Sequence, residues 1–284
     1  MTRSFSLTLV ALLAVLFSCT EEIEISLDSS ERRLVVEGNF SDDTLAHQVR
    51  LSLSAGYFVN QPLQPVLGAI VTISDGTTIF PLAESSEDSG LYLTAPDVHG
   101  TPGNTYTLTI DGVDVDSDGK PESYTASGKM NPLGAVDSIQ VKSKKIFYQD
   151  VWVVNFYAQE PGETRDYYVF RTWKNGVNLK DTLLELNPSD DEIINGVYSD
   201  GMTVQYLFAD KPDEKLIQGD TIMLEIQGIT KEYYQFIFDV MSEAHGSDPF
   251  GGQPANVSTN LSNGAVGFFN TYSVKRLSRV YDGN

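Results

Sequence analysis

Hydrophobic and polar residues alternate over short stretches in the first half of the chain. Residues 49–54 are apolar at every second position, which is the period of a half-buried β-strand. Residues 69–74 alternate in the same way and lead into Asp75-Gly76, a dipeptide that favours hairpin turns. Because residues 77–82 then provide a returning strand, this part of the sequence predicts an antiparallel hairpin.

Further short strands are predicted at residues 33–40, 91–96 and 104–110. They follow one another at intervals of roughly ten residues, and Gly, Pro, Asn and Asp separate them. This spacing is typical of an antiparallel sandwich. We therefore predict that residues 32–128 form an immunoglobulin-like or transthyretin-like β-sandwich domain.

The second half of the chain follows a connector at residues 128–138 and is again rich in predicted strands. A different period occurs in residues 230–244, where the apolar side chains fall on one face of a helix and Thr230 is placed to cap its N-terminus. Residues 129–284 are thus predicted to form a second β-rich domain with one packed helix, which makes the fold class mainly β. The predicted strands cover residues 138–144, 151–158, 166–174, 203–209 and 221–229.

The N-terminus carries a different signal. Arg3 precedes an uncharged, largely apolar run of thirteen residues at positions 5–17, which is too short for the roughly 20 apolar residues of a membrane-spanning helix. A basic residue followed by a short apolar run is the layout of a secretory signal. We expect residues 1–18 to be a lipoprotein signal peptide and residues 19–31 an acidic tether.

The residues around Cys19 make the cleavage site specific. The tetrapeptide Leu16-Phe17-Ser18-Cys19 resembles the lipobox of bacterial lipoproteins, although Phe17 departs from the small residue usual at its position. The resemblance implies that Cys19 becomes the mature N-terminus, with diacylglycerol on its sulfur and an acyl chain on its amine. Two or more such chains anchor a protein stably in the membrane. Since Cys19 is the only cysteine in the chain, an internal disulfide is excluded.

An acidic run follows the cysteine directly. Residues 20–24 read Thr-Glu-Glu-Ile-Glu and resemble the export signal that directs Bacteroidota lipoproteins to the outer face of the outer membrane. The alternative is a solvated tether whose acidity is incidental, which would leave the protein facing the periplasm. We expect a lipid-anchored outer-membrane protein at the cell surface.

Charge narrows the range of partners. The chain has 19 Lys and Arg against 39 Asp and Glu, a net charge of −20. Such a surface repels phosphate backbones, so no nucleic-acid partner is expected. It also disfavours peripheral attachment to anionic lipid, which leaves the N-terminal lipid anchor as the expected contact with the membrane.

Several stretches together are similar to a Bacteroidota outer-membrane lipoprotein family known only as a domain of unknown function. They include RLVVEGNFSDD near the start, YTASGKMNPLGAVDSIQV in the middle and DPFGGQPANVSTNLSNGAVGFFNTYSV near the end. Members are often encoded beside TonB-dependent receptors. The resemblance implies a non-catalytic accessory binding or docking partner of a TonB-dependent transporter. Two alternatives remain open: a self-standing surface adhesion module and a hydrolase.

One segment has a spacing that suits a metal ion. Asp114, Asp116, Asp118 and Gly119 match the pattern D-x-D-x-D-G, in which carboxylates on one side of a turn can bind Ca²⁺. The rest of an EF-hand loop is missing, because its twelfth position is Thr125 instead of Glu. A solvated acidic turn without metal is the alternative, and no other cofactor is expected.

Aromatic side chains are the remaining candidates for binding. Tyr57 and Phe58 lie in a Pro-containing loop, and Trp173 lies on a predicted strand, where a ligand or partner could stack against them. Packing in the core is the alternative, above all for Trp173. The sequence contains no phosphate-binding loop, nucleophile elbow or paired histidines, and no feature selects a catalytic pair among its many carboxylates.

Overall fold

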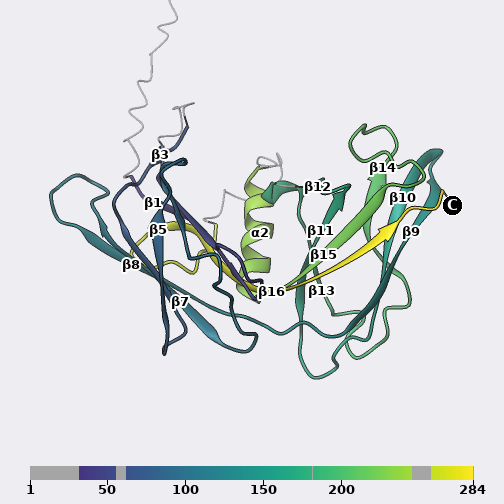
Figure 1. The fold of residues 1–284 in the computed structure, drawn as a ribbon, viewed down its shortest axis with the longest axis horizontal. Coiled ribbons are helices and arrows are strands. Elements are labelled where there is room, and N and C mark those ends of the chain that lie inside the picture. Colours follow the sequence, from purple (N-terminus) through teal and green to yellow (C-terminus); the bar gives the residue numbers. More distant parts are fainter. Residues whose placement is uncertain (1–31, 56–61, 181, 245–256, 284) are drawn as a thin grey trace, which may run out of the picture. The chain divides into compact units, whose positions relative to one another are not determined.

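The computed structural model describes residues 32–55, 62–180, 182–244 and 257–283. In these residues the protein is mainly β with one packed α-helix, as predicted (Figure 1). The predicted sites Cys19, Tyr57 and Phe58 lie outside the described residues. No helix in the described part of the chain is both long and apolar enough to span a bilayer.

The six strands predicted in the first half are present, and the structure adds β3 and β8, which were not predicted. In β7, for example, Tyr106, Leu108 and Ile110 share one face and are all almost completely buried. The hairpin predicted around Asp75-Gly76 joins β4 to β5. The bounds are β1 (Leu34–Ser41), β2 (Gln48–Leu53), β3 (Gln64–Pro65), β4 (Ile70–Ser74), β5 (Ile79–Glu84), β6 (Leu91–Leu93), β7 (Thr105–Val113) and β8 (Glu122–Lys129).

The second half contains the remaining strands, a short 3-10 helix and the α-helix. Each of its five predicted strands and the predicted helix are present. The bounds are β9 (Val136–Ile146), β10 (Gln149–Ala158), β11 (Tyr167–Lys174), β12 (Val177–Asn178), η1 (Leu183–Glu185), β13 (Asn187–Asp190), β14 (Met202–Phe208), β15 (Thr221–Ile229), α2 (Lys231–Ala244) and β16 (Val266–Val280).

The long strand β16 connects the two halves of the chain. It pairs in parallel with β1, from Val35 opposite Val266 to Ser41 opposite Tyr272, and antiparallel with β15. Figure 1 shows it in yellow, running between the two groups of strands. Through β16 the described strands form a 13-stranded sheet, beside which β14, β10 and β9 form a second sheet of three strands. The predicted boundary between two domains near residue 128 stays a prediction.

Three clusters of buried side chains hold these layers together. The first lies among β1–β8 and also contains Leu261, Ala265 and Phe269 from the C-terminal region. The second lies between the three-stranded sheet and the β11–β15 face, and the third lies between α2 and the opposite face of β11. Strand β11 therefore buries both faces, with Tyr168 and Phe170 in the second cluster and Tyr167 and Val169 in the third.

Helix α2 begins as predicted but turns a slightly different face to the core. Thr230 caps it, because its hydroxyl oxygen accepts a hydrogen bond from the main-chain N–H of Tyr233 at 3.1 Å. The face predicted from the sequence consists of Tyr233, Tyr234, Ile237, Phe238 and Met241. In the structure Phe236, which is not part of that face, is buried, whereas Phe238 is 45% exposed. Phe238 packs edge-on against Tyr234 with their ring centroids 4.8 Å apart, so it still covers part of an aromatic side chain.

The imidazole of His47 is buried and is held in its neutral form. The main-chain N–H of Ser41 donates to Nδ1 at 3.4 Å, so Nε2 carries the proton and donates to the carbonyl of Val98 at 3.2 Å. Burial lowers the pKa of His47 below its usual value of 6.5. When the pH falls below that value, the unfolded chain binds a proton that the folded protein does not, and this proton uptake favours unfolding.

We therefore expect the free energy of unfolding to fall as the pH decreases from about 7 to 5, by up to about 1.4 kcal/mol per pH unit from this group. His47→Gln should remove most of this dependence, as measured by urea unfolding across that range. The matched control is His99→Gln, because His99 is exposed. Equal pH dependence in the wild type and His47→Gln would contradict the assignment.

Candidate functional site

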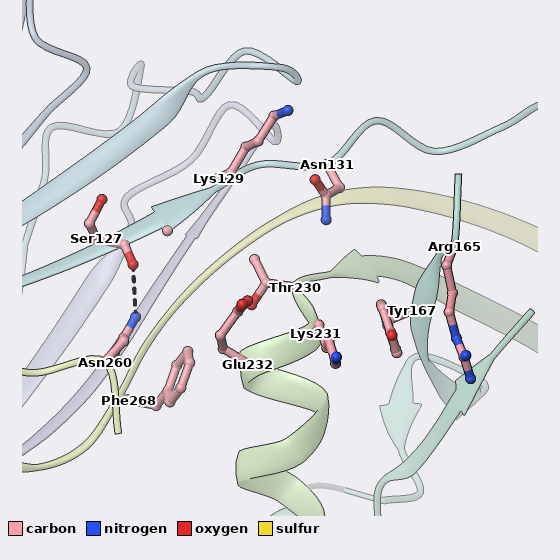
Figure 2. A pocket seen from close by; sticks show the side chains of 11 residues that line it. Ser127, Lys129, Asn131, Arg165, Tyr167, Thr230, Lys231, Glu232, Asn260 and Phe268 are labelled. Atoms are coloured by element: carbon pink, nitrogen blue, oxygen red, sulfur yellow. Dashed lines mark hydrogen bonds between the residues drawn. The ribbon is translucent and has the colours of Figure 1, made fainter. Parts of the chain in front are cut away.

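A cleft of about 680 Å³ opens where the first and second halves of the chain meet at the start of α2 (Figure 2). Its volume lies within the range of small-molecule binding sites, roughly 300–1,000 Å³. Side chains come to it from β8, from the loops after β8 and before β11, from α2 and from β16. The lining residues are Ser127, Gly128, Lys129, Asn131, Arg165, Tyr167, Thr230, Lys231, Glu232, Asn260 and Phe268.

The polar walls of the cleft are fixed by hydrogen bonds to the backbone. The Asn260 amide donates to the carbonyl of Ser127 at 3.2 Å and to that of Phe269 at 2.9 Å. On the other side, the Asn131 amide donates to the carbonyl of Ile229 at 3.2 Å. Because these amides tie β8 and the connector to β15 and β16, the shape of the cleft exists before any ligand enters.

Two aromatic side chains form an apolar surface in the cleft. Phe268 packs against Tyr233 and Phe236 of α2, with ring centroids 5.2 Å and 5.1 Å away, and is itself buried. Tyr167 lies at the start of β11 and packs against Tyr234 with a centroid distance of 5.0 Å. These contacts hold both rings in place, so the cleft offers a rigid apolar face beside polar groups.

The charges of the cleft are mostly positive. Lys129, Arg165 and Lys231 line it together with one carboxylate, that of Glu232. Arg165 forms ion pairs with Asp190 at 3.0 Å and Glu192 at 2.8 Å. Lys129 and Lys231 are exposed and form no ion pair with another described residue.

The first turn of α2 adds to this positive charge. Main-chain N–H groups at a helix N-terminus carry a partial positive charge, and Thr230, Lys231 and Glu232 place that end of α2 in the cleft. In a chain of net charge −20, a cleft with this lining selects for an anionic group on its ligand. The described lining residues include no histidine or cysteine.

The three aspartates predicted to bind Ca²⁺ do come together. They lie in the turn between β7 and β8, with a carboxylate oxygen of each within 4.8 Å of the others. Asp114 and Asp116 each accept a hydrogen bond from the main-chain N–H of Asp118 at 3.1 Å, and Asp114 accepts another from Gly119 at 2.9 Å. The backbone of the turn thus uses the same oxygens that a cation would use, and calcium binding here stays a prediction.

Trp173 does not reach the cleft. It is half-buried near the far end of β11, opposite Asn178 of β12 and Met223 of β15. Tyr167 on the same strand lines the cleft and lies six residue steps away along β11, a distance of roughly 20 Å. Sequence reasoning predicted only a capping role for Thr230 and did not single out Tyr167 or the cleft lysines, whose proximity depends on the pairing of β16.

A family model described as "Domain of unknown function (DUF4249)" matches residues 20–278. A search of curated proteins found no match.

Proposed function

Because the chain belongs to the DUF4249 family, whose description assigns no activity, we propose its function from its own residues. We propose a non-catalytic outer-membrane lipoprotein that captures a small anionic ligand in the cleft. In this role it serves a TonB-dependent transporter as an accessory binding protein. The lipid anchor on Cys19 keeps it at the membrane, and the acidic run in residues 20–24 supports a position at the cell surface.

The observation that carries this proposal is the positive cleft in a strongly acidic protein. A net charge of −20 repels anions from most of the surface. The cleft is a local region of positive charge, which comes from Lys129, Lys231 and the N-terminus of α2. Tyr167 and Phe268 supply the apolar area that small-molecule sites need beside a few polar groups. The ligand that fits best is therefore a small molecule with a carboxylate or phosphate group and an apolar body.

Charge reversal in the cleft tests the binding site. We expect Lys129→Glu combined with Lys231→Glu to weaken ligand retention by at least roughly tenfold, because charged hydrogen bonds contribute about 1.5–3 kcal/mol each. Native mass spectrometry of the detergent-solubilised protein measures retention. The matched control is Lys142→Glu with Lys144→Glu, two exposed lysines of β9 outside the cleft. Equal retention in both double variants would place the ligand elsewhere.

The transporter partnership has a separate test. Affinity purification of the wild type from solubilised outer membranes should bring down a TonB-dependent barrel, and a purification without any barrel protein would count against this role. Deletion of the gene should then block uptake of the ligand. Loss of attachment to a polymer or another cell, with uptake intact, would favour the alternative of a self-standing adhesion module.

A further inference from the structure

A second group of acidic side chains lies apart from the cleft and is buried. Glu160 follows β10, Asp166 precedes β11 and Asp191 follows β13, so three separate segments bring these carboxylates together. One oxygen of each lies within 4.8 Å of the others. Glu160 is 5% exposed and Asp191 is fully buried, whereas Asp166 is half-buried and leaves a way in from solvent.

Each of the three carboxyl groups accepts a hydrogen bond from a nearby donor. The Tyr168 hydroxyl donates to Glu160, and the Thr164 hydroxyl donates to Asp166 at 2.8 Å. The main-chain N–H of Asp166 donates to Oδ2 of Asp191 at 3.0 Å. In each of these bonds the carboxyl group is the acceptor, which suits an ionised group.

Negative charge in this cluster has no protein cation to balance it. None of the three carboxylates forms an ion pair with a described Lys, Arg or His, and the nearby Arg165 pairs instead with Asp190 and Glu192. Like charges gathered in a buried site are costly unless a counter-ion joins them.

One oxygen in the cluster also has no partner among the described residues. Oδ1 of Asp191 is buried and accepts no hydrogen bond from any of them. Leaving a buried charged acceptor unpaired costs free energy, and native proteins pair nearly all such atoms with protein, water or an ion. An anionic oxygen with free lone pairs inside a group of carboxylates is the arrangement that a hard cation completes.

We propose that Glu160, Asp166 and Asp191 bind a calcium ion. Two oxygens that coordinate one Ca²⁺ at about 2.4 Å can lie at most about 4.8 Å apart, and the three carboxylates meet this limit. Ca²⁺ is favoured over Mg²⁺, because Mg²⁺ keeps several waters and is usually held by only one or two carboxylates. Neither the family description nor the aspartate turn at residues 114–118 accounts for this site.

The ion would join segments that are far apart in the sequence. The loop after β10 already contacts the loop after β13, because the main-chain N–H of Glu160 donates to the carbonyl of Val197 at 3.2 Å. A cation shared by Glu160, Asp166 and Asp191 would fix both loops to the start of β11. Since Arg165 precedes Asp166 directly, the same ion would also steady the segment that presents Arg165 to the cleft.

Thermal unfolding of the full acylated protein in detergent, after removal of metal with EDTA, tests the proposal. At about 100 times its Kd, Ca²⁺ should raise the unfolding midpoint of the wild type by roughly 5–10 °C. Asp191→Asn, which keeps the side-chain size, should lose this rise and weaken Ca²⁺ binding by about tenfold or more. Terbium provides a direct probe, because Tyr168 beside Glu160 can sensitise emission from Tb³⁺ bound at the site.

The matched control is Asp114→Asn in the exposed aspartate turn, which should respond to Ca²⁺ like the wild type. If Asp191→Asn does not fold, Glu160→Gln takes its place and should give the same loss. A wild-type midpoint that Ca²⁺ leaves unchanged would overturn the proposal. So would a calcium response that Asp114→Asn abolishes and Asp191→Asn retains, because that result would place the ion in the turn.

Discussion

Gly267→Ala is expected to destabilise the protein by about 4 kcal/mol. Gly267 lies in β16 directly opposite Val36 of β1, with φ at +98°. A Cβ atom at this position would lie 2.1 Å from the main-chain oxygen of Val36, far inside van der Waals contact. Because that oxygen belongs to the backbone of a paired strand, it cannot rotate away as a side chain would.

The size of the effect follows from two separate costs. A non-glycine residue in left-handed backbone costs roughly 1–2 kcal/mol, and overpacking of a well-packed site typically costs about 1–3 kcal/mol more. Native proteins are stable by only about 5–15 kcal/mol, so a loss of this size removes a large share of the total. A distortion at Gly267 would also affect two strand pairings, because β16 pairs with both β1 and β15.

Urea unfolding monitored by tryptophan fluorescence measures the loss. Gly264→Ala is the matched control, because Gly264 also has a positive φ, +72°, but a Cβ there meets no atom within 4 Å. Gly264→Ala should lower the free energy of unfolding only by the cost of a non-glycine residue in left-handed backbone, about 1–2 kcal/mol. Equal losses in the two variants would mean that β1 and β16 do not approach each other as closely at Gly267 as the structure shows.

The strands could be predicted because their signal is local. In β7 the buried side chains Tyr106, Leu108 and Ile110 recur at every second position, and so do the buried apolar side chains of β2, so each pattern lies within a single strand. Thr230 was equally visible as the cap of α2, since a cap depends on neighbours only a few residues away. Phe236 and Phe238 were harder to tell apart, because both border the apolar stripe and the packing of Phe268 decides which one is buried.

The pairing of β16 with β1 has no such local signal. These strands are about as far apart in the chain as two strands can be, and parallel pairing leaves no turn between them to read from the sequence. Strand β11 shows a related difficulty. Alternation assigns one face to the core, whereas the structure covers one face with a sheet and the other with α2.

The two candidate metal sites differ in the same way, because one is local in the sequence and the other is assembled by the fold. Asp114, Asp116 and Asp118 are visible in the sequence because a single turn contains them all. Glu160, Asp166 and Asp191 share their chemistry, yet they belong to three segments that only the packing of the second half brings together. Among so many acidic residues, these three are distinguished by their convergence at one place, where Glu160 and Asp191 are buried.

Cys19→Ser should release the protein from the membrane almost completely. Cys19 lies outside the described residues, and this prediction rests on its place in Leu16-Phe17-Ser18-Cys19. A serine cannot receive the thioether-linked lipid, so the acyl chains would be lost. Each buried methylene contributes about 0.8 kcal/mol to membrane binding, and two or more chains give stable anchoring that no other feature of an acidic chain replaces.

Separation of membrane and soluble fractions, followed by detection of the protein in each, gives the result. Thr20→Ser is the matched control, because it makes a small change at the next position and should leave the protein in the membrane fraction. Cooperative urea unfolding of the released Cys19→Ser protein would show that it is folded and not merely aggregated or degraded. If the Cys19→Ser protein stayed fully membrane-bound, some other contact would hold it there, and this result would contradict the proposed lipid anchor.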